Sequence, residues 1–182
     1  MMQVKKEISK TAPVILVGFM GTGKTTLAEY IAHKENKTFA DLDKIIEKET
    51  NKSIPEIFAE EGELKFRELE SKYLINSLEK YDIISTGGGI VESVTSMNTL
   101  SKLNNIFWLD TDIEVIYERI KNDSNRPNAN NKAFDDLKRL YLSRLSRYNE
   151  IAFSRIDTNI EVDILYQNLM NILNADDQYW RV

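Results

Sequence analysis

The chain of 182 residues contains no cysteine, a single histidine and three prolines. Without cysteine it can form neither a disulfide nor a thiolate metal centre, a composition typical of reducing compartments. Long apolar runs are also missing, because the N-terminal segment VILVGFM (residues 14–20) is interrupted by glycine and is too short for a signal peptide or a membrane span. From these absences we expect a cytoplasmic protein with no membrane partner.

The charge balance is acidic, with a net charge of −5 at pH 7. Broad electrostatic binding to nucleic acid is therefore not expected, and an anionic small molecule must be bound by a local cluster of cations. The hydrophobic content of 42% is sufficient for one core. We accordingly predict a single domain over residues 1–182 and a monomer.

Short apolar segments alternate with helical patterns along the chain. Strands are predicted near residues 14–17, 38–41, 83–84, 105–109 and 153–157, and helices over 25–34, from 53, 63–80, 112–121, 134–148 and 161–174. This alternation predicts an α/β fold with a parallel sheet. The polar, asparagine-rich segment KNDSNRPNANNK (residues 121–132) predicts an exposed mobile loop.

Behind the first predicted strand, residues 18–25 read GFMGTGKT and match the pattern GxxxxGK(S/T) completely. Glycines let successive backbone N–H groups surround phosphate oxygens, and the N-terminus of the following helix adds its positive end. Lys24 is suited to the β- and γ-phosphates, and the Thr25 hydroxyl to Mg²⁺. The alternative is a glycine-rich turn without a ligand, which the strand–loop–helix context disfavours. We therefore predict a nucleoside triphosphate site formed by Gly21, Thr22, Gly23, Lys24, Thr25 and Thr26.

Three further features lie at or near the carboxyl ends of predicted strands, where ligands bind in open α/β sheets. Strand alternation at Asp41 and Asp43 predicts two carboxylates near the phosphate loop, one for a water of Mg²⁺ and one to accept a hydroxyl proton; taken alone, such a pair is more often a helix cap. The triplet Gly87–Gly89 either allows close backbone approach to a ligand or forms a tight turn. Arg67 either binds a carboxylate or pairs with Glu63 or Glu70 on a solvated helix.

Together these segments resemble shikimate kinases: GFMGTGKTT, FADLD, SIPEIFAEEGELKFRELE, STGGG, an arginine–proline loop and RLSRY follow in that order over residues 13–160. The resemblance implies the fold of nucleoside-monophosphate kinases, a five-stranded parallel sheet flanked by helices. It also implies a substrate-binding region at about 42–72 and a mobile lid at about 121–133. The implied activity is transfer of the γ-phosphoryl group of ATP to the 3-hydroxyl of shikimate, with Mg²⁺, on the route to chorismate.

The resemblance also implies roles for individual residues. Lys24, Asp43 and Arg126 would be catalytic, with Asp43 as general base and Arg126 as the lid arginine on the phosphates. Arg119 would lie against the adenine, and Thr25 and Asp41 would serve the metal. Asp43, Arg67, Gly87, Gly88, Gly89 and Arg144 would bind shikimate.

Two departures from the family pattern stand out. Asn128 and Ala129 replace the two leucines that usually follow the lid proline, and Arg147 competes with Arg144 as the second carboxylate ligand. On a helix those two arginines lie on neighbouring faces, so only one points easily into a cleft. The alternative functions are a related gluconate or nucleotide kinase, and a nucleotide-binding protein that has lost catalysis.

Overall fold

Five parallel strands form the centre of the computed structural model, which describes residues 12–121 and 134–175. The strands are β1 (Val14–Val17), β2 (Phe39–Asp41), β3 (Ile83–Ser85), β4 (Ile106–Asp110) and β5 (Ser154–Asp157). Their order across the sheet is β2-β3-β1-β4-β5, and every neighbouring pair is parallel. The predicted five-stranded parallel sheet is confirmed.

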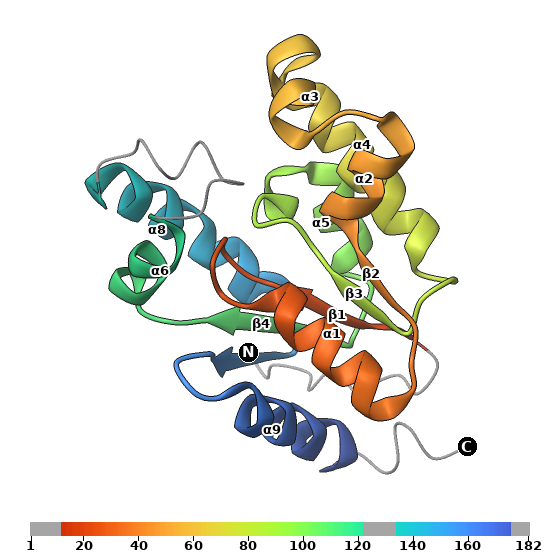
Figure 1. The fold of residues 1–182 in the computed structure, drawn as a ribbon, viewed down its shortest axis with the longest axis vertical. Coiled ribbons are helices and arrows are strands. Elements are labelled where there is room, and N and C mark those ends of the chain that lie inside the picture. Colours follow the sequence, from red (N-terminus) through yellow and green to blue (C-terminus); the bar gives the residue numbers. More distant parts are fainter. Residues whose placement is uncertain (1–11, 122–133, 176–182) are drawn as a thin grey trace, which may run out of the picture.

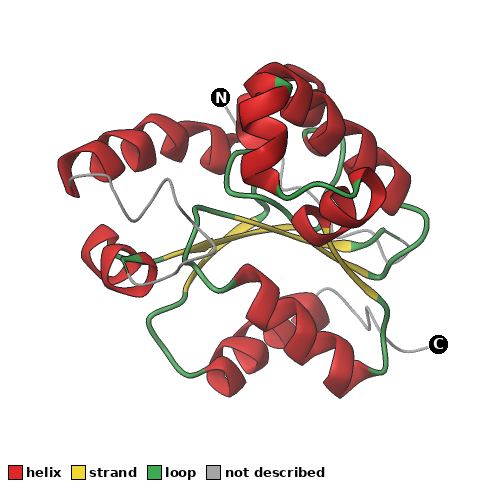
Figure 2. Cartoon of the chain, turned by 45° about the horizontal axis from the view of Figure 1, so that its top comes forward, coloured by secondary structure: helices red, strands yellow, loops and turns green. Residues whose placement is uncertain are grey.

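Helices cover both faces of this sheet, which Figure 2 shows nearly edge-on. The helical elements are α1 (Lys24–Glu35), α2 (Leu42–Thr50), α3 (Ile54–Glu60), α4 (Gly62–Ser77), the short 3₁₀ turn η1 (Ile90–Glu92), α5 (Val94–Leu100), α6 (Ile113–Ile120), α8 (Phe134–Ile151) and α9 (Val162–Ala175). None of the helices in the described ranges is long and apolar enough to span a membrane.

The side chains of β1 explain how two helical layers pack on one sheet. Val14 and Leu16 face α1 and α9, and Ile15 and Val17 face the other layer, which α4, α5 and α8 form; all four are fully buried. A smaller cluster around Ile46, Ile57 and Phe66 joins α2, α3 and α4 beyond one edge of the sheet (Figure 1). The helices α2, α3 and α4 therefore have a small core of their own beside the sheet.

The boundaries of several helices follow from their capping residues. A capping box between Ser53 and Glu56 begins α3, as predicted. The span of helix α2 was not predicted, but the helix-cap alternative for the aspartate pair is confirmed: Asp41 ends β2 and caps α2 by accepting a hydrogen bond from the Lys44 N–H. The strand alternation assumed for Asp43 is therefore wrong, because Asp43 lies in the first turn of a helix, but both carboxylates do lie beside the phosphate loop as predicted. The predicted lid with Arg126, Asn128 and Ala129 lies outside the described residues, as does the tail from residue 176.

Candidate active site

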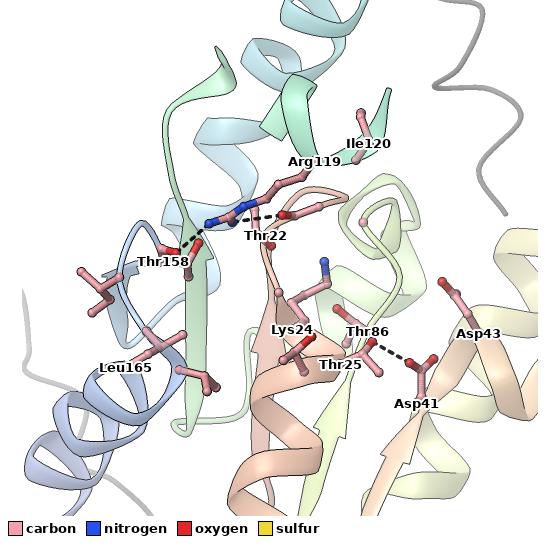
Figure 3. Close-up of a pocket in the computed structure, with 16 residues that line it drawn as sticks. Thr22, Lys24, Thr25, Asp41, Asp43, Thr86, Arg119, Ile120, Thr158 and Leu165 are labelled. Atoms are coloured by element: carbon pink, nitrogen blue, oxygen red, sulfur yellow. Dashed lines mark hydrogen bonds between the residues drawn. The ribbon is translucent and has the colours of Figure 1, made fainter. Parts of the chain in front are cut away.

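The phosphate loop joins β1 to α1 in the predicted strand–loop–helix context (Figure 3). Gly21 and Gly23 have φ angles of 77° and 84°, in the left-handed region that favours glycine, and Gly23 is the N-cap residue directly before α1. Thr22 is fully buried and its hydroxyl donates to the Phe19 carbonyl over 2.8 Å. The loop conformation thus favours glycine at Gly23, which the sequence pattern fixes, and also at Gly21, which the pattern leaves open.

Lys24 is largely buried at the first position of α1. Its Nζ donates to the carbonyl oxygens of Gly18 and Phe19 over 2.9 and 2.8 Å, inside the curve of the loop. A lysine here opposes the helix dipole, but it adds a positive charge where backbone N–H groups already favour an anion. The arrangement suits the oxygens of a polyphosphate.

Thr25 and Asp41 bring two oxygen donors together from different elements. The Thr25 hydroxyl donates to Asp41 Oδ2 over 2.7 Å, and Ser85 Oγ lies 3.4 Å from the same hydroxyl. Among the described residues no cluster of three acidic or histidine side chains could hold a metal by itself. Mg²⁺ commonly binds one or two protein oxygens together with phosphate oxygens and water, so a hydroxyl and a carboxylate fit this ion.

A pocket of about 380 Å³ opens beside the phosphate loop. Its lining includes Gly21, Thr22, Gly23, Lys24, Thr25, Thr26, Asp41, Asp43, Gly88 and Arg119. The guanidinium of Arg119 donates to the carbonyls of Gly21 and Thr158 over 3.2 and 3.0 Å, and so bridges the loop and the segment after β5 (Figure 3). All the described residues predicted for ATP and metal therefore border one cavity.

Close packing of neighbouring protein atoms explains why glycine occupies all three positions of the triplet after β3. Gly87, Gly88 and Gly89 are not among the described residues with positive φ, so their backbone conformation does not require glycine. A Cβ on Gly87 would lie 2.6 Å from Glu70 Oε1 and 2.8 Å from Asp43 Oδ1, and one on Gly88 would lie 2.9 Å from the Met20 nitrogen. A Cβ on Gly89 would collide with the Arg67 guanidinium. Of the two predictions for the triplet, the turn is confirmed, since the Ile90 N–H donates to the Gly87 carbonyl over 3.2 Å; close approach to a ligand stays a prediction.

Arg67, on α4, is paired with Glu70 and Glu63, but it is not on a solvated surface, since its side chain is only 13% exposed. Glu70 is fully buried and uses Oε2 for Arg67, whereas its Oε1 has no hydrogen-bond partner among the described residues. Burial raises the pKa of Glu70 to about 7; Arg67 opposes this rise and the charge of Asp43 adds to it. Arg67, Glu70 and Asp43 thus gather beside the triplet.

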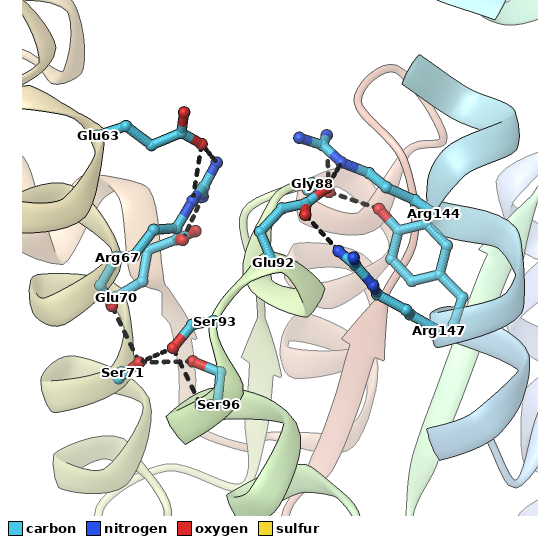
Figure 4. A network of polar contacts seen from close by, with 11 residues as sticks. Glu63, Arg67, Glu70, Ser71, Gly88, Glu92, Ser93, Ser96, Arg144 and Arg147 are labelled. Carbon is cyan, nitrogen blue, oxygen red and sulfur yellow. Dashed lines mark hydrogen bonds and ion pairs between the residues drawn. The ribbon is translucent and has the colours of Figure 1, made fainter. Parts of the chain in front are cut away.

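Arg144 reaches the other side of the triplet from α8 (Figure 4). Its Nη1 donates to the Gly88 carbonyl over 3.2 Å, the same oxygen that accepts from the Tyr148 hydroxyl. Its guanidinium carbon lies 5.6 Å from the centre of the Phe19 ring, above the ring face. Arg144 is buried and contacts the triplet, whereas the Arg147 side chain is 44% exposed and pairs with Glu92.

Two carboxylates in this arrangement were missed from the sequence as site residues. The sequence predicts Glu70 only as a surface partner of Arg67, and it predicts no role for Glu92. A lone glutamate in the otherwise apolar segment after the triplet, GGGIVES, was the available signal for Glu92. Its partners come from α8, about fifty residues later, and no local pattern identifies them.

Known proteins are similar to this chain to different degrees. The family model described as shikimate kinase matches residues 20–174. The shikimate kinase of Staphylococcus haemolyticus (strain JCSC1435) is 49% identical over 166 residues, which cover 91% of this chain and 96% of the relative.

Among solved structures, a shikimate kinase from Acinetobacter baumannii in complex with shikimate has a TM-score of 0.83 at 30% identity, covering 91% of this chain and 94% of the other. A gluconokinase from Sinorhizobium meliloti 1021 has a TM-score of 0.56 at 14% identity, covering 90% of this chain and 92% of the other. The second likeness shows a shared fold alone.

Proposed function

The chain belongs to the shikimate kinase family, and on that premise we propose that it transfers the γ-phosphoryl group of ATP to the 3-hydroxyl of shikimate. The observation that supports the proposal most directly is the contact between the phosphate loop and the glycine triplet. Gly88 approaches the Met20 nitrogen so closely that a Cβ would lie 2.9 Å from it. The phosphate loop and the glycine triplet are therefore adjacent, so a donor in one and an acceptor against the other would be neighbours.

On the donor side, we assign the backbone of Gly21–Thr26 and the Lys24 ammonium to the ATP phosphates, and Arg119 to the adenine. Thr25 and Asp41 would hold Mg²⁺, which neutralises charge on the phosphate oxygens when it is bound. Arg126, from the lid at about 121–133, would add positive charge around the transferring group. Lys24 and the loop N–H groups fix the position of the γ-phosphate.

On the acceptor side, we assign the shikimate carboxylate to Arg67 and Arg144, which flank the triplet from α4 and α8. Two guanidiniums suit a carboxylate because each offers paired N–H donors in one plane. The backbone of Gly87, Gly88 and Gly89 would contact the bound ring, with the region at about 42–72 covering it. A small hydroxy acid thus meets cations at one end and a carboxylate at the other.

Asp43 is assigned as the general base. It borders the pocket that contains Lys24 and Thr25, and its Oδ1 faces Gly87. In the transfer step the 3-hydroxyl oxygen bonds to the γ-phosphorus, the bond from that phosphorus to the bridging oxygen of ADP breaks, and Asp43 takes the hydroxyl proton. All these assigned residues belong to one chain, and with a net charge of −5 we propose a cytoplasmic monomer that binds no nucleic acid.

Measuring ADP formation with ATP, Mg²⁺ and shikimate tests this function. Shikimate is expected to stimulate ADP formation well above the rate without an acceptor, and gluconate or nucleoside monophosphates are not. Stimulation by one of these other acceptors instead would indicate a related small-molecule kinase. ATP binding without stimulation by any acceptor would indicate a nucleotide-binding protein that has lost catalysis.

A further inference from the structure

Glu92, at the end of η1, binds two arginines of α8 at once (Figure 4). Its Oε1 accepts from Arg144 Nε over 2.7 Å, and its Oε2 accepts from Arg147 Nη1. No role has yet been assigned to this glutamate or to Arg147. Because one carboxylate connects both arginines, the orientation of Arg144 depends on Glu92.

Two further contacts restrict the same guanidinium. Arg144 lies over the Phe19 ring and donates to the Gly88 carbonyl, which Tyr148 holds from the other direction. A guanidinium has five N–H donors, and among the described residues Glu92 and Gly88 are its hydrogen-bond acceptors. Other N–H groups of Arg144 therefore remain for an external carboxylate. Because the guanidinium is planar, the hydrogen bond from Nε to Glu92 sets the direction in which those groups point.

The charges explain why a second arginine is present. A carboxylate beside Arg144 would by itself repel an incoming carboxylate and cancel the charge of Arg144. Arg147 contacts the other oxygen of Glu92 from the solvent side, so the three groups together carry one net positive charge. The two arginines favour the ionised form of Glu92: burial raises the pKa of this carboxyl, but hydrogen bonds from Arg144 and Arg147 produce a net lowering.

The segment that carries Glu92 is itself fixed to the helix that carries Arg67. Ser93, the next residue, caps α5, and its hydroxyl lies 2.8 Å from that of Ser71 on α4. Ser71 also contacts Ser96 over 2.8 Å and donates to the Arg67 carbonyl over 2.9 Å. The two predicted carboxylate ligands are thus connected through Glu92 and this group of serines.

We propose that Glu92 and Arg147 are positioning residues for Arg144: Glu92 orients the guanidinium toward the shikimate carboxylate, and Arg147 offsets the charge that Glu92 introduces. The proposal rests on the proposed function, since it concerns the binding of that substrate. It also accounts for Arg147, which acts through Glu92 and does not itself contact shikimate.

The opposite role for Glu92 gives the opposite result. If Glu92 competed with shikimate for Arg144, its removal would release the guanidinium and lower KM for shikimate. If Glu92 orients Arg144, its removal raises KM. The sign of the change in KM therefore separates the two roles.

Steady-state kinetics test the proposal with four variants: Glu92→Ala, Arg147→Ala, Arg147→Lys and the double variant Glu92→Ala/Arg147→Ala. Shikimate binding to each is measured separately by calorimetry without ATP. Arg139→Ala is the matched control, since Arg139 is an exposed arginine of α8 that pairs with Asp136. For Glu92→Ala we expect KM for shikimate and the calorimetric Kd to rise about tenfold, a loss of about 1.4 kcal/mol, with kcat and KM for ATP within about twofold.

For Arg147→Ala we expect a rise of about threefold in KM for shikimate, which Arg147→Lys restores because the charge is kept. In the Glu92→Ala background, Arg147→Ala should add nothing, since Arg147 acts on the charge of Glu92. A KM for shikimate that is unchanged or lower in Glu92→Ala overturns the proposal, and so does an additive effect of Arg147→Ala in the double variant.

Failure of the proposed function is distinguishable from failure of this inference. If the unmodified protein neither binds nor phosphorylates shikimate, the function is wrong, and the positioning role is overturned with it. If the unmodified protein is active but the variants behave as Arg139→Ala does, only the positioning role is wrong. Arg147 is partly exposed, so its variants are expected to fold, and circular dichroism checks this.

Discussion

The guanidinium of Arg67 occupies the space that a side chain on Gly89 would need. Gly89 has φ −101° and ψ 5°, a conformation that alanine can adopt, so glycine is required there by the neighbouring arginine and not by the backbone. The same triplet meets the phosphate loop at Gly88, through the backbone of Met20. Adjacent glycines therefore border different halves of the site.

This difference predicts separable effects of two alanine substitutions. Gly89→Ala should displace the flexible end of Arg67 and raise KM for shikimate at least about tenfold, with little change in KM for ATP or in Tm. Gly88→Ala should press on loop backbone, which yields less easily than a side chain, and so raise KM for ATP and lower Tm. Steady-state kinetics and thermal unfolding of both variants check this, and equal effects on KM for ATP would contradict it.

Removal of the Thr25 hydroxyl tests the metal assignment. Thr25→Val deletes the group that bonds Asp41 Oδ2 over 2.7 Å, while nearly keeping the side-chain volume. We expect kcat to fall about a hundredfold and the Mg²⁺ concentration for half-maximal activity to rise, because one of the two protein oxygens is lost. Thr25→Ser retains the hydroxyl and serves as the control. An unchanged Mg²⁺ requirement in Thr25→Val would exclude this site.

The role of Asp43 as general base predicts a selective loss of turnover. Asp43→Asn keeps the size of the side chain but removes its capacity to accept a proton, so kcat should fall about 10²- to 10⁴-fold. KM for ATP and the Tm should change little. Glu49→Gln, at an exposed glutamate of the same helix, is the matched control. Turnover within a few-fold of the unmodified protein would rule out Asp43 as the base.

The buried carboxyl of Glu70 predicts a pH-dependent contribution to stability. Its pKa is raised from 4.5 to about 7 in the folded protein, so between these values the folded state binds more protons than the unfolded chain. The contribution of Glu70 is therefore fully present below pH 4.5 and is lost as the pH rises through about 7, by up to about 3 kcal/mol in the free energy of unfolding.

Urea unfolding between pH 4.5 and 8 checks this prediction. The free energy of unfolding of the unmodified protein should fall with rising pH relative to that of Glu70→Gln. Glu68→Gln, at an exposed glutamate of α4, should instead follow the pH curve of the unmodified protein. Parallel curves for the unmodified protein and Glu70→Gln would show that Glu70 titrates normally.

The sequence correctly predicts those helices and strands in which the local residue pattern agrees with the packing of the folded chain. The phosphate loop is identifiable because its glycines, Lys24 and Thr25 follow a fully apolar strand, and β1 with α1 confirms this context. Helix α5 was missed because VTSMNTL is short, polar and partly β-branched; the Ser93 cap and the burial of Leu100 stabilise it instead. After β2, the two-residue alternation of a strand predicts the position of Asp43, although helix α2 begins at Leu42.

The site carboxylates were harder to predict, for a physical reason. Glu70 looks like an i,i+3 surface partner of Arg67, and only the packing of α4 against the triplet buries it. Glu92 gains its partners from α8 through the folded chain. Pairings between distant segments leave no periodic signal in the residues that make them.

The position of the new phosphate on the product tests the central claim most directly. After reaction with ATP and Mg²⁺, phosphorus and proton nuclear magnetic resonance of the purified product should show one phosphate ester whose phosphorus couples to the proton at C3 of shikimate. An ester at another hydroxyl, or the absence of any shikimate ester while ATP is consumed, would contradict the account.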